Sequence, residues 1–211
     1  MNDQLKLWTG DFGDVYHLRN PNSFKSVKAR VAMFKDILSV IEQNDNKKNP
    51  KRILRSVLEV GAGTGANLLA IRESSSAILA AVEPNRSAFD EIKATGVATG
   101  LMMCCDWMDF PDSYEKWDMV FTSGVLIHVH PTRRKKFMDK VIEVSDRYVV
   151  AIEYFSPELR EVTYHGESDA LWIDDWGKLY ADMGLKLLSC KFYYKGLTWL
   201  DNLTCFIFEK V

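Results

Sequence analysis

The feature that most constrains the fold of this chain is a glycine-rich turn, Gly61–Gly65, which carries three glycines in five residues. Val57, Leu58 and Val60 come directly before it, as expected of a short strand buried on both faces of a parallel sheet. Residues 67–71 follow as a helix. Glycine lets the backbone turn sharply and approach a ligand closely, and a helix start offers unpaired N–H groups to a carboxylate or phosphate. This order of elements predicts a nucleotide-cofactor site more than an ordinary glycine-rich turn.

Strands and helices alternate along the rest of the chain, which predicts an α/β fold with a doubly wound, mostly parallel sheet and helices on both faces. Helices are predicted over residues 24–42, 67–71, 87–95, 132–145 and 174–183. Strands are predicted over residues 57–60, 77–82, 97–103, 117–124, 147–152, 186–194 and 204–208. The chain ends on two strands after its last helix, which favours an antiparallel last strand. At 211 residues the chain is expected to form one domain.

Two segments do not fit this alternation. Residues 155–173 are polar and aromatic and are interpreted as a long connection, a kind of loop that often has a function. Residues 1–20 mix aromatic, glycine and charged residues without a helix or strand period. We interpret residues 1–22 as an N-terminal flap that brings polar groups to a site, or as an arm whose Trp8 and Phe12 only cover the core; both interpretations remain open.

Polar residues follow several of the predicted strands. Glu83 comes 22 residues after Gly61, where a βαβ cofactor fold has its ribose-hydroxyl acceptor. Asp106 and Trp107 follow the third strand, and a carboxylate beside a flat apolar ring suits a purine with an exocyclic amine. Residues 122–124 end the fourth strand. Because ligands of such sheets bind at the carboxyl ends of the strands, we expect these segments to meet in one crevice.

The cofactor class stays open on these motifs alone. Gly61-x-Gly63-x-x-Ala66 followed by Glu83 also fits the fingerprint of a dinucleotide site. Against a nicotinamide-dependent oxidoreductase, the chain has no room for a second substrate domain, and no Tyr is followed four residues later by Lys. A cofactor-binding protein without catalysis is a further alternative.

Charge and motif content argue against several partners and ligands. A formal net charge of −2 gives no electrostatic case for nucleic-acid binding, and residues 122–125 replace the Asn/Asp-Pro-Pro-aromatic motif expected of a nucleic-acid methyltransferase. His128 and His130 have no third metal ligand nearby, and the four cysteines show no zinc spacing. We find no signal-peptide pattern and no apolar run of membrane-spanning length, so we expect a cytoplasmic protein with free thiols.

The ordered motifs resemble those of a known class of enzymes. Residues 58–65, 82–84, 105–107 and 117–123 look like the motifs of class I S-adenosylmethionine-dependent methyltransferases, which have a Rossmann-like sheet. More narrowly, residues 7–20, 124–131, 148–154 and 164–166 are similar to methylases associated with the biosynthesis of pseudaminic acid, a nonulosonate sugar.

This resemblance implies S-adenosyl-L-methionine as cofactor, S-adenosyl-L-homocysteine as product and a small-molecule methyl acceptor, such as a nonulosonate or another sugar (nucleotide) intermediate. It implies cofactor contacts from Tyr16, Arg19, Gly61, Ala62, Gly63, Glu83, Pro84, Asp106, Trp107, Thr122 and Ser123. The donor brings its own leaving group, so alignment supplies most of the catalysis, and a base is needed only for a hydroxyl or a protonated amine. His128 and Glu153 are the candidate bases, and Tyr16, His165 and Asp169 are the candidate acceptor contacts.

Overall fold

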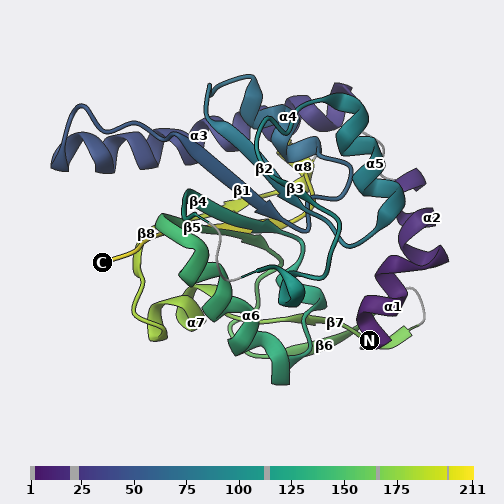
Figure 1. Cartoon of the computed structure of the whole chain (residues 1–211). Coiled ribbons are helices and arrows are strands. Elements are labelled where there is room, and N and C mark those ends of the chain that lie inside the picture. Colours follow the sequence, from purple (N-terminus) through teal and green to yellow (C-terminus); the bar gives the residue numbers. More distant parts are fainter. Residues whose placement is uncertain (1–2, 20–23, 112–114, 165–166, 199) are drawn as a thin grey trace.

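The computed structural model describes residues 3–19, 24–111, 115–164, 167–198 and 200–211. Its centre is a seven-stranded sheet with the strand order β3-β2-β1-β4-β5-β9-β8 (Figure 1). The strands are β1 (Ser56–Val60), β2 (Ile78–Val82), β3 (Met102–Met103), β4 (Trp117–Ser123), β5 (Ser145–Glu153), β8 (Lys186–Tyr193) and β9 (Leu203–Glu209). Strands β1 to β5 pair in parallel, whereas β9 pairs antiparallel with β5 and β8. The predicted mostly parallel sheet with an antiparallel last strand is confirmed.

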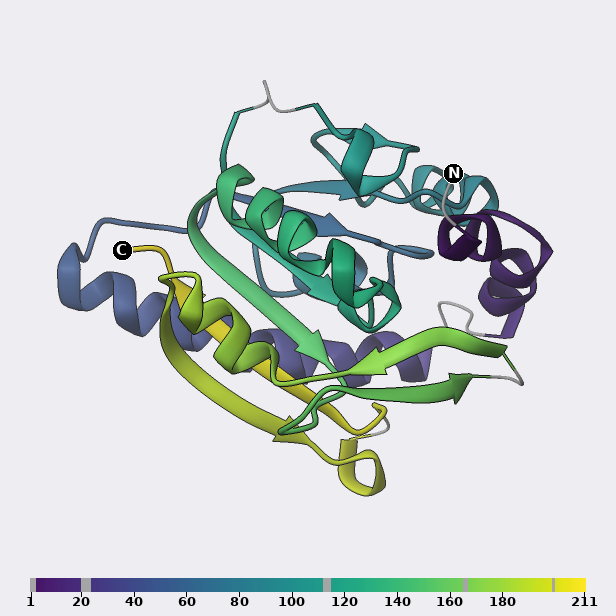
Figure 2. The same cartoon turned by 90° about the horizontal axis from the view of Figure 1, so that it is seen from below.

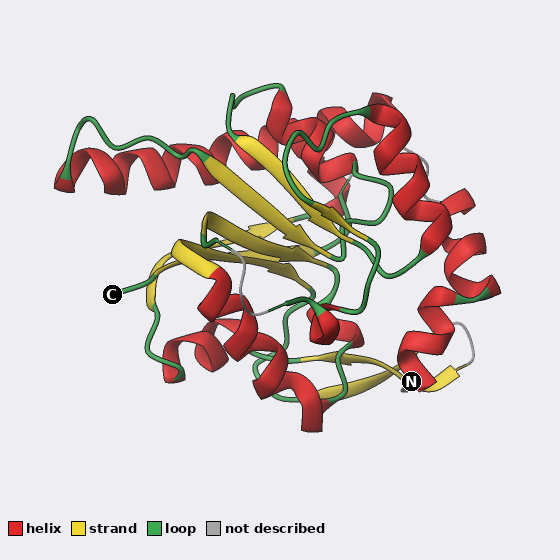
Figure 3. Ribbon diagram, in the orientation of Figure 1, coloured by secondary structure: helices red, strands yellow, loops and turns green. Residues whose placement is uncertain are grey.

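Helices cover both faces of this sheet (Figure 3). One face packs against α3 (Phe24–Lys48), α4 (Ala66–Arg72) and α5 (Arg86–Thr95), and the other against α6 (Pro131–Val144) and α7 (Trp176–Asp182). Successive strand residues point to opposite faces, so Val57 joins the first core and Leu58 the second. Because both faces are covered, the strands are continuous apolar runs.

The strand order reverses between β1 and β4. From β1 the chain moves outward through β2 to β3, and then returns to place β4 on the other side of β1. At such a reversal the loops that leave neighbouring strands turn to opposite faces, which opens a crevice at the carboxyl ends of the strands. This is the crevice that the sequence predicts.

The N-terminal segment forms two helices, α1 (Asp3–Thr9) and α2 (Asp11–Arg19), which lie beside α5 (Figure 1). Most of residues 1–20 are therefore helical, although the sequence shows no helical period there. These helices carry an aromatic cluster. The ring of Trp8 lies 5.3 Å from that of Phe12 and 5.1 Å from that of Tyr16. The rings of Phe12 and Tyr16 thus both pack on that of Trp8.

Residues 155–173 are only partly a loop, because β6 (Arg160–Tyr164) and β7 (Glu167–Ile173) form an antiparallel hairpin. The hairpin extends beyond the carboxyl end of β5 (Figure 2). Leu171 and Trp172 of β7 are buried, and β7 packs against the short helix η2 (Leu126–His128). The pattern was missed because these strands lie outside the main sheet and carry mixed polar and aromatic residues.

Several predicted boundaries also differ from the structure. Helix α3 continues to Lys48 instead of ending at Glu42, and the strand predicted over 97–103 is confined to Met102–Met103. Ser145 belongs to β5 and not to α6, and the connection before β9 contains the short helix α8 (Lys195–Thr198). A further short helix, η1 (Trp107–Asp109), follows β3. In the described part of the chain, no helix has the length and apolar character needed to cross a membrane.

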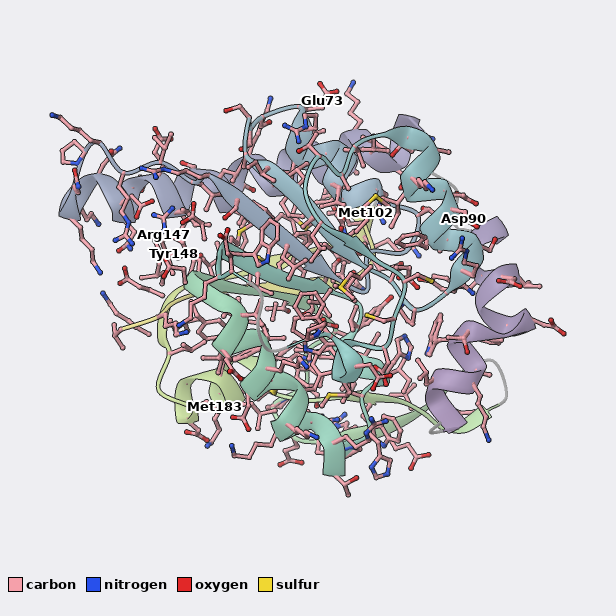
Figure 4. The ribbon with its side chains drawn as sticks, viewed as in Figure 1. Glu73, Asp90, Met102, Arg147, Tyr148 and Met183 are labelled. Atoms are coloured by element: carbon pink, nitrogen blue, oxygen red, sulfur yellow. The ribbon has the colours of Figure 1, made fainter. Side chains whose placement is uncertain are left out.

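The amino ends of the strands carry a buried network of charges centred on Arg147. Its guanidinium donates to Asp45 at 2.7 Å and to Asp118 at 3.0 Å, and Tyr148 Oη donates to Asp45 at 2.7 Å. Figure 4 shows Arg147 and Tyr148 at the end of the molecule away from α1 and α2. Burial lowers the pKa of Arg147, but the hydrogen bonds to Asp118 and Asp45 outweigh it and raise that pKa. These charges join α3, β4 and β5.

Candidate functional site

A cavity of about 290 Å³ lies at the carboxyl ends of β1, β2 and β4, and α1, α2 and α6 contribute to its wall. The residues expected from the sequence that line it are Tyr16, Gly61, Ala62, Gly63, Glu83, Pro84, Asp106, Trp107, Ser123 and His128. Segments far apart in the sequence therefore meet in one crevice, as the strand order requires.

The glycine turn adopts a backbone that side chains would obstruct. Gly61, Gly63 and Gly65 all have positive φ angles, of 72°, 53° and 84°. A Cβ on Gly61 would lie 2.5 Å from Cγ2 of Val125, so the turn also needs glycine to pass the loop after β4. The amides of Gly61 and Ala62 both donate to the carbonyl of Val82, at 2.8 and 3.2 Å. The turn is thus fixed to the end of β2, next to Glu83.

Glu83 is 6% exposed, and backbone amides hold both of its carboxylate oxygens. Oε2 accepts from the amide of Gly63 at 2.7 Å, and Oε1 accepts from that of Asn85 at 2.8 Å. Burial raises the pKa of Glu83 to about 7, although these hydrogen bonds oppose the shift. The carboxylate therefore links the glycine turn to the start of α5.

Asp106 and Trp107 form the wall of the cavity beside α6. Asp106 caps η1, because its Oδ1 accepts from the amide of Met108 at 3.2 Å, and its Oδ2 lies 3.9 Å from Nη2 of Arg133. Trp107 is 3% exposed, stacks on Phe110 with 4.8 Å between ring centroids, and donates from Nε1 to the carbonyl of Phe137 at 3.3 Å. This anchoring fixes a flat ring at the cavity wall.

His128 ends η2 and contacts the N-terminal helix α1. Its ring centroid lies 4.3 Å from that of Trp8, which also lines the cavity. Glu153, at the end of β5, is fully buried, and its Oε1 accepts from the amides of Val125 and Leu126, both at 3.2 Å. Burial raises the pKa of Glu153 to about 7 against these bonds. Glu153 does not line the cavity but holds the turn that carries His128.

The structure does not place the remaining predicted site residues at the cavity. Thr122 is buried in β4 and does not line the cavity. Arg19 ends α2 and Asp169 belongs to β7, but their side chains are outside the described part of the structure, and His165 lies outside the described residues altogether. Across the described residues, no group of three His, Cys, Asp or Glu side chains is placed to hold a metal ion.

The cavity also contains polar residues that the sequence analysis missed, above all Arg30 of α3, Glu59 of β1 and Asn67 of α4. Glu59 is fully buried, and burial raises its pKa to about 8. A carboxylate inside an otherwise apolar strand was the signal for Glu59. Arg30 gave no signal, because polar residues are expected on one side of a long amphipathic helix.

His130 and Arg133, at the start of α6, also line the cavity. The Nδ1 of His130 accepts from the amide of Thr132 at 3.2 Å and caps the helix, and its ring contacts that of Trp172 at 5.1 Å. The hairpin β6–β7 and α6 thus come together at this side of the cavity, where Arg133 supplies a cation.

Residues 57–146 match the sequence model of a methyltransferase domain. The match begins in β1 and ends at the start of β5, so it covers the glycine turn, Glu83, Asp106 and His128. The first three helices and the last strands lie outside it. No curated protein matches the chain significantly.

Solved structures share this fold at low sequence identity, among them two that are named as methyltransferases. Magnesium protoporphyrin IX methyltransferase from Synechocystis PCC 6803, with bound S-adenosylmethionine, has 12% identity and a TM-score of 0.67, over 100% of this chain and 99% of that one. The 1,6-didemethyltoxoflavin-N1-methyltransferase of Burkholderia thailandensis, with bound 1,6-didemethyltoxoflavin and S-adenosylhomocysteine, has 12% identity and a TM-score of 0.71. The match covers 98% of this chain and 87% of that one. DesVI of Streptomyces venezuelae has 14% identity and a TM-score of 0.65, over 96% and 99%.

Proposed function

We propose that the protein is a class I, S-adenosylmethionine-dependent methyltransferase that acts on a polar small molecule, a nonulosonate or another sugar (nucleotide) intermediate. The observation that carries the donor assignment is the meeting of the glycine turn, Glu83 and the Asp106–Trp107 wall at one cavity. Two proteins of similar fold are named as methyltransferases of small molecules, one of magnesium protoporphyrin IX and one of 1,6-didemethyltoxoflavin.

The groups that line the cavity suit the parts of the methyl donor. A Cβ at Gly61 would be blocked, so the turn offers bare backbone to a ligand. Glu83 would accept the ribose hydroxyls, Asp106 the adenine amino group, and Trp107 would flank the ring, with Ala62 and Pro84 beside it. A backbone carbonyl at Thr122 or Ser123 would accept from the ammonium group, and Tyr16 and Arg19 would cover the cofactor. When bound, the sulfonium supplies an activated methyl group.

His128 is the residue that we assign to proton removal from the acceptor. It lines the cavity, and an imidazole has a pKa near neutrality, which suits a general base. We propose a positioning role for Glu153, because its Oε1 accepts from the amides of Val125 and Leu126, in the turn that carries His128. An acceptor that needs no base would leave His128 to orient the acceptor alone.

Positive charge at the cavity favours an acceptor with an acidic group. Arg133 and His130 line the cavity beside the β6–β7 hairpin. Nη2 of Arg133 lies 3.9 Å from Oδ2 of Asp106. A guanidinium binds carboxylate or phosphate well, and nonulosonates and sugar nucleotides carry these groups. We propose His165 and Asp169, on the hairpin side, as further acceptor contacts.

Two experiments test this function. Isothermal titration with S-adenosylmethionine, S-adenosylhomocysteine and NAD is expected to show binding of the first two only. A screen with a radiolabelled methyl donor over nonulosonates, sugar nucleotides and neutral sugars is then expected to label an acidic sugar. Binding of NAD instead would indicate an oxidoreductase, and donor binding with no labelled acceptor in any class would favour a cofactor-binding protein without catalysis.

A further inference from the structure

We propose that Trp8 of the N-terminal helix α1 is a positioning residue that stabilises the protonated ring of His128 through the face of its indole. The inference rests on the proposed function, in which His128 removes a proton from the acceptor. It adds to that step a residue from outside the matched methyltransferase segment. Trp8 and His128 both line the cavity.

The two rings are close enough for a cation–π interaction. Their centroids lie 4.3 Å apart, and their planes are inclined at 55°. A cation within about 6 Å of an aromatic centroid is attracted by the negative ring face, and tryptophan gives the strongest attraction. The contacts of Trp8 with Phe12 and Tyr16 are edge-to-face and longer, at 5.3 and 5.1 Å. Of these three ring contacts, the shortest is with the one partner that can gain a positive charge.

Backbone contacts fix the indole beside His128. The carbonyl of Trp8 accepts from Nδ2 of Asn85 at 3.0 Å. Asn85 is itself held, because its Oδ1 caps α5 by accepting from the amide of Ala88 at 2.9 Å, and its amide donates to Glu83. The segment that holds Glu83 at the cavity therefore also sets the position of Trp8.

The indole nitrogen takes no part in this placement. Nε1 of Trp8 is buried and has no hydrogen-bond partner among the described residues. A buried N–H without a partner costs free energy, and leucine or phenylalanine would fill an apolar space without that cost. What tryptophan adds here is a large, electron-rich ring face, which is the part that a neighbouring cation contacts.

Proton removal creates the charge that this face stabilises. The acceptor atom forms its bond to the methyl carbon, the carbon–sulfur electron pair stays on sulfur, and the acceptor proton moves to a ring nitrogen of His128. The imidazole becomes a cation in a cavity where it is less well solvated than in water. The indole lowers the cost of that charge through its face, so it does not compete for the nitrogen that takes the proton.

Other charged and titratable groups also act on His128. Glu153 bonds the amides of the turn that carries it, and β7 packs against η2, although the side chains of Glu167 and Asp169 are outside the described part of the structure. Further such groups at the cavity are Tyr16, Glu83, Asp106, His130 and Arg133. The pKa of His128 therefore has several contributions, and the test has to change the indole alone.

The test changes the charge on the indole face and keeps its shape. Fluorine withdraws electrons from the ring, so 5-fluorotryptophan weakens a cation–π contact at nearly constant volume. The wild type and Trp8→Leu are each prepared with tryptophan or 5-fluorotryptophan at every tryptophan position. NMR titration of the ligand-free protein measures the pKa of His128, whose signal is assigned with His128→Gln. Phe12→Leu is the matched control, because it removes another ring of the same cluster, and thermal unfolding shows whether each variant is folded.

We expect Trp8→Leu to lower the proton affinity of the His128 ring about threefold, seen as a fall in its pKa. In the wild type, 5-fluorotryptophan should cause a smaller fall, and in Trp8→Leu it should cause none. Phe12→Leu should leave the pKa unchanged. A pKa that does not fall in Trp8→Leu, or a fluorine effect that persists without Trp8, would overturn the proposal.

Activity separates this role from packing alone. In the pH profile of kcat/KM, Trp8→Leu should move the acid limb to lower pH and lower the plateau, because His128 becomes a weaker base. A lower plateau with an unmoved limb would show that Trp8 only packs at the cavity, and would also overturn the proposal. If the wild type methylates no acceptor, the proposed function fails, which the NMR titration distinguishes from failure of the ring contact.

Discussion

The two ends of the central sheet differ in whether their buried charged groups have partners. At the amino ends of the strands, Arg147 is bonded to both Asp45 and Asp118, so each buried charge meets a partner of opposite sign. At the carboxyl ends, Glu59 and Glu153 each keep one buried oxygen without a hydrogen-bond partner. At the same end, Nε1 of Trp8 is also buried without a hydrogen-bond partner. At the amino ends, Trp117 is the one described side chain with a buried polar atom that lacks a partner.

This difference separates stability from ligand binding. Paired charges at the amino ends join α3, β4 and β5, and removing one partner leaves the others buried and uncompensated. At the carboxyl ends, Glu59 lines the cavity with one unpaired oxygen and a raised pKa, and this costs folding energy that a ligand with complementary groups recovers on binding. The sheet is therefore held together at one end and prepared for ligands at the other.

The largest effect should come from breaking the network at the amino ends. Arg147→Met is expected to destabilise the protein by about 3–5 kcal/mol, because Asp45 and Asp118 would lose their buried counter-ion. Urea unfolding measures this change. In conditions where the variant stays folded, its Kd for S-adenosylhomocysteine should equal that of the wild type. A stable variant with weakened ligand binding would contradict the division between the two ends.

At the carboxyl ends, His128→Ala is expected to act on turnover and not on folding. Loss of a general base lowers kcat by roughly 10²–10⁴-fold, while Kd for the donor should change little. Single-turnover kinetics and titration calorimetry measure the two quantities. Equal losses of both would show that His128 has only a structural role.

Glu153→Gln should change how stability depends on pH. In the folded protein the carboxyl has a pKa of about 7, against 4.5 for an exposed glutamate, so between these values only the folded state keeps the proton. The proton on Glu153 therefore stabilises the folded state below pH 4.5, and this stabilisation is lost as the pH rises through about 7. The loss in unfolding free energy is roughly 3 kcal/mol.

Unfolding free energies of the wild type and Glu153→Gln, measured from pH 4 to 8, test this expectation. The wild type should lose stability relative to the variant as the pH rises, because glutamine does not titrate. The variant keeps an oxygen for the amides of Val125 and Leu126, so its turnover should stay near that of the wild type. A large loss of turnover would instead indicate that Glu153 is the base.

The smallest effect is expected in the cover formed by α1 and α2. Gly13→Ala would place a Cβ 1.9 Å from the carbonyl of Trp8 and 2.8 Å from Nδ2 of Asn85, which bonds that same carbonyl. The displaced cover should lower kcat/KM about tenfold, or ~1.4 kcal/mol, and weaken donor binding, because Tyr16 and Arg19 are proposed to cover the cofactor; steady-state kinetics and titration calorimetry measure the two effects. Val15→Ala, at an exposed position of the same helix, is the control.

Sequence alone predicted the alternation of strands and helices and ten of the residues that line the cavity. The apolar strands, the glycine turn and Glu83 are local signals, since a strand buried on both faces must be apolar and a turn with positive φ favours glycine. The rule that ligands bind at the carboxyl ends of parallel strands then brings these segments together.

Only the tertiary structure showed where the unpaired charges lie. Arg30 looks like a solvated residue of an amphipathic helix until α3 packs against α4 and brings it to Asn67. The helices α1 and α2 and the β6–β7 hairpin are held by contacts between distant segments, such as Trp8 with His128 and His130 with Trp172. Local sequence periodicity determines which residues a strand or helix buries, but pairing between distant side chains depends on how the elements pack.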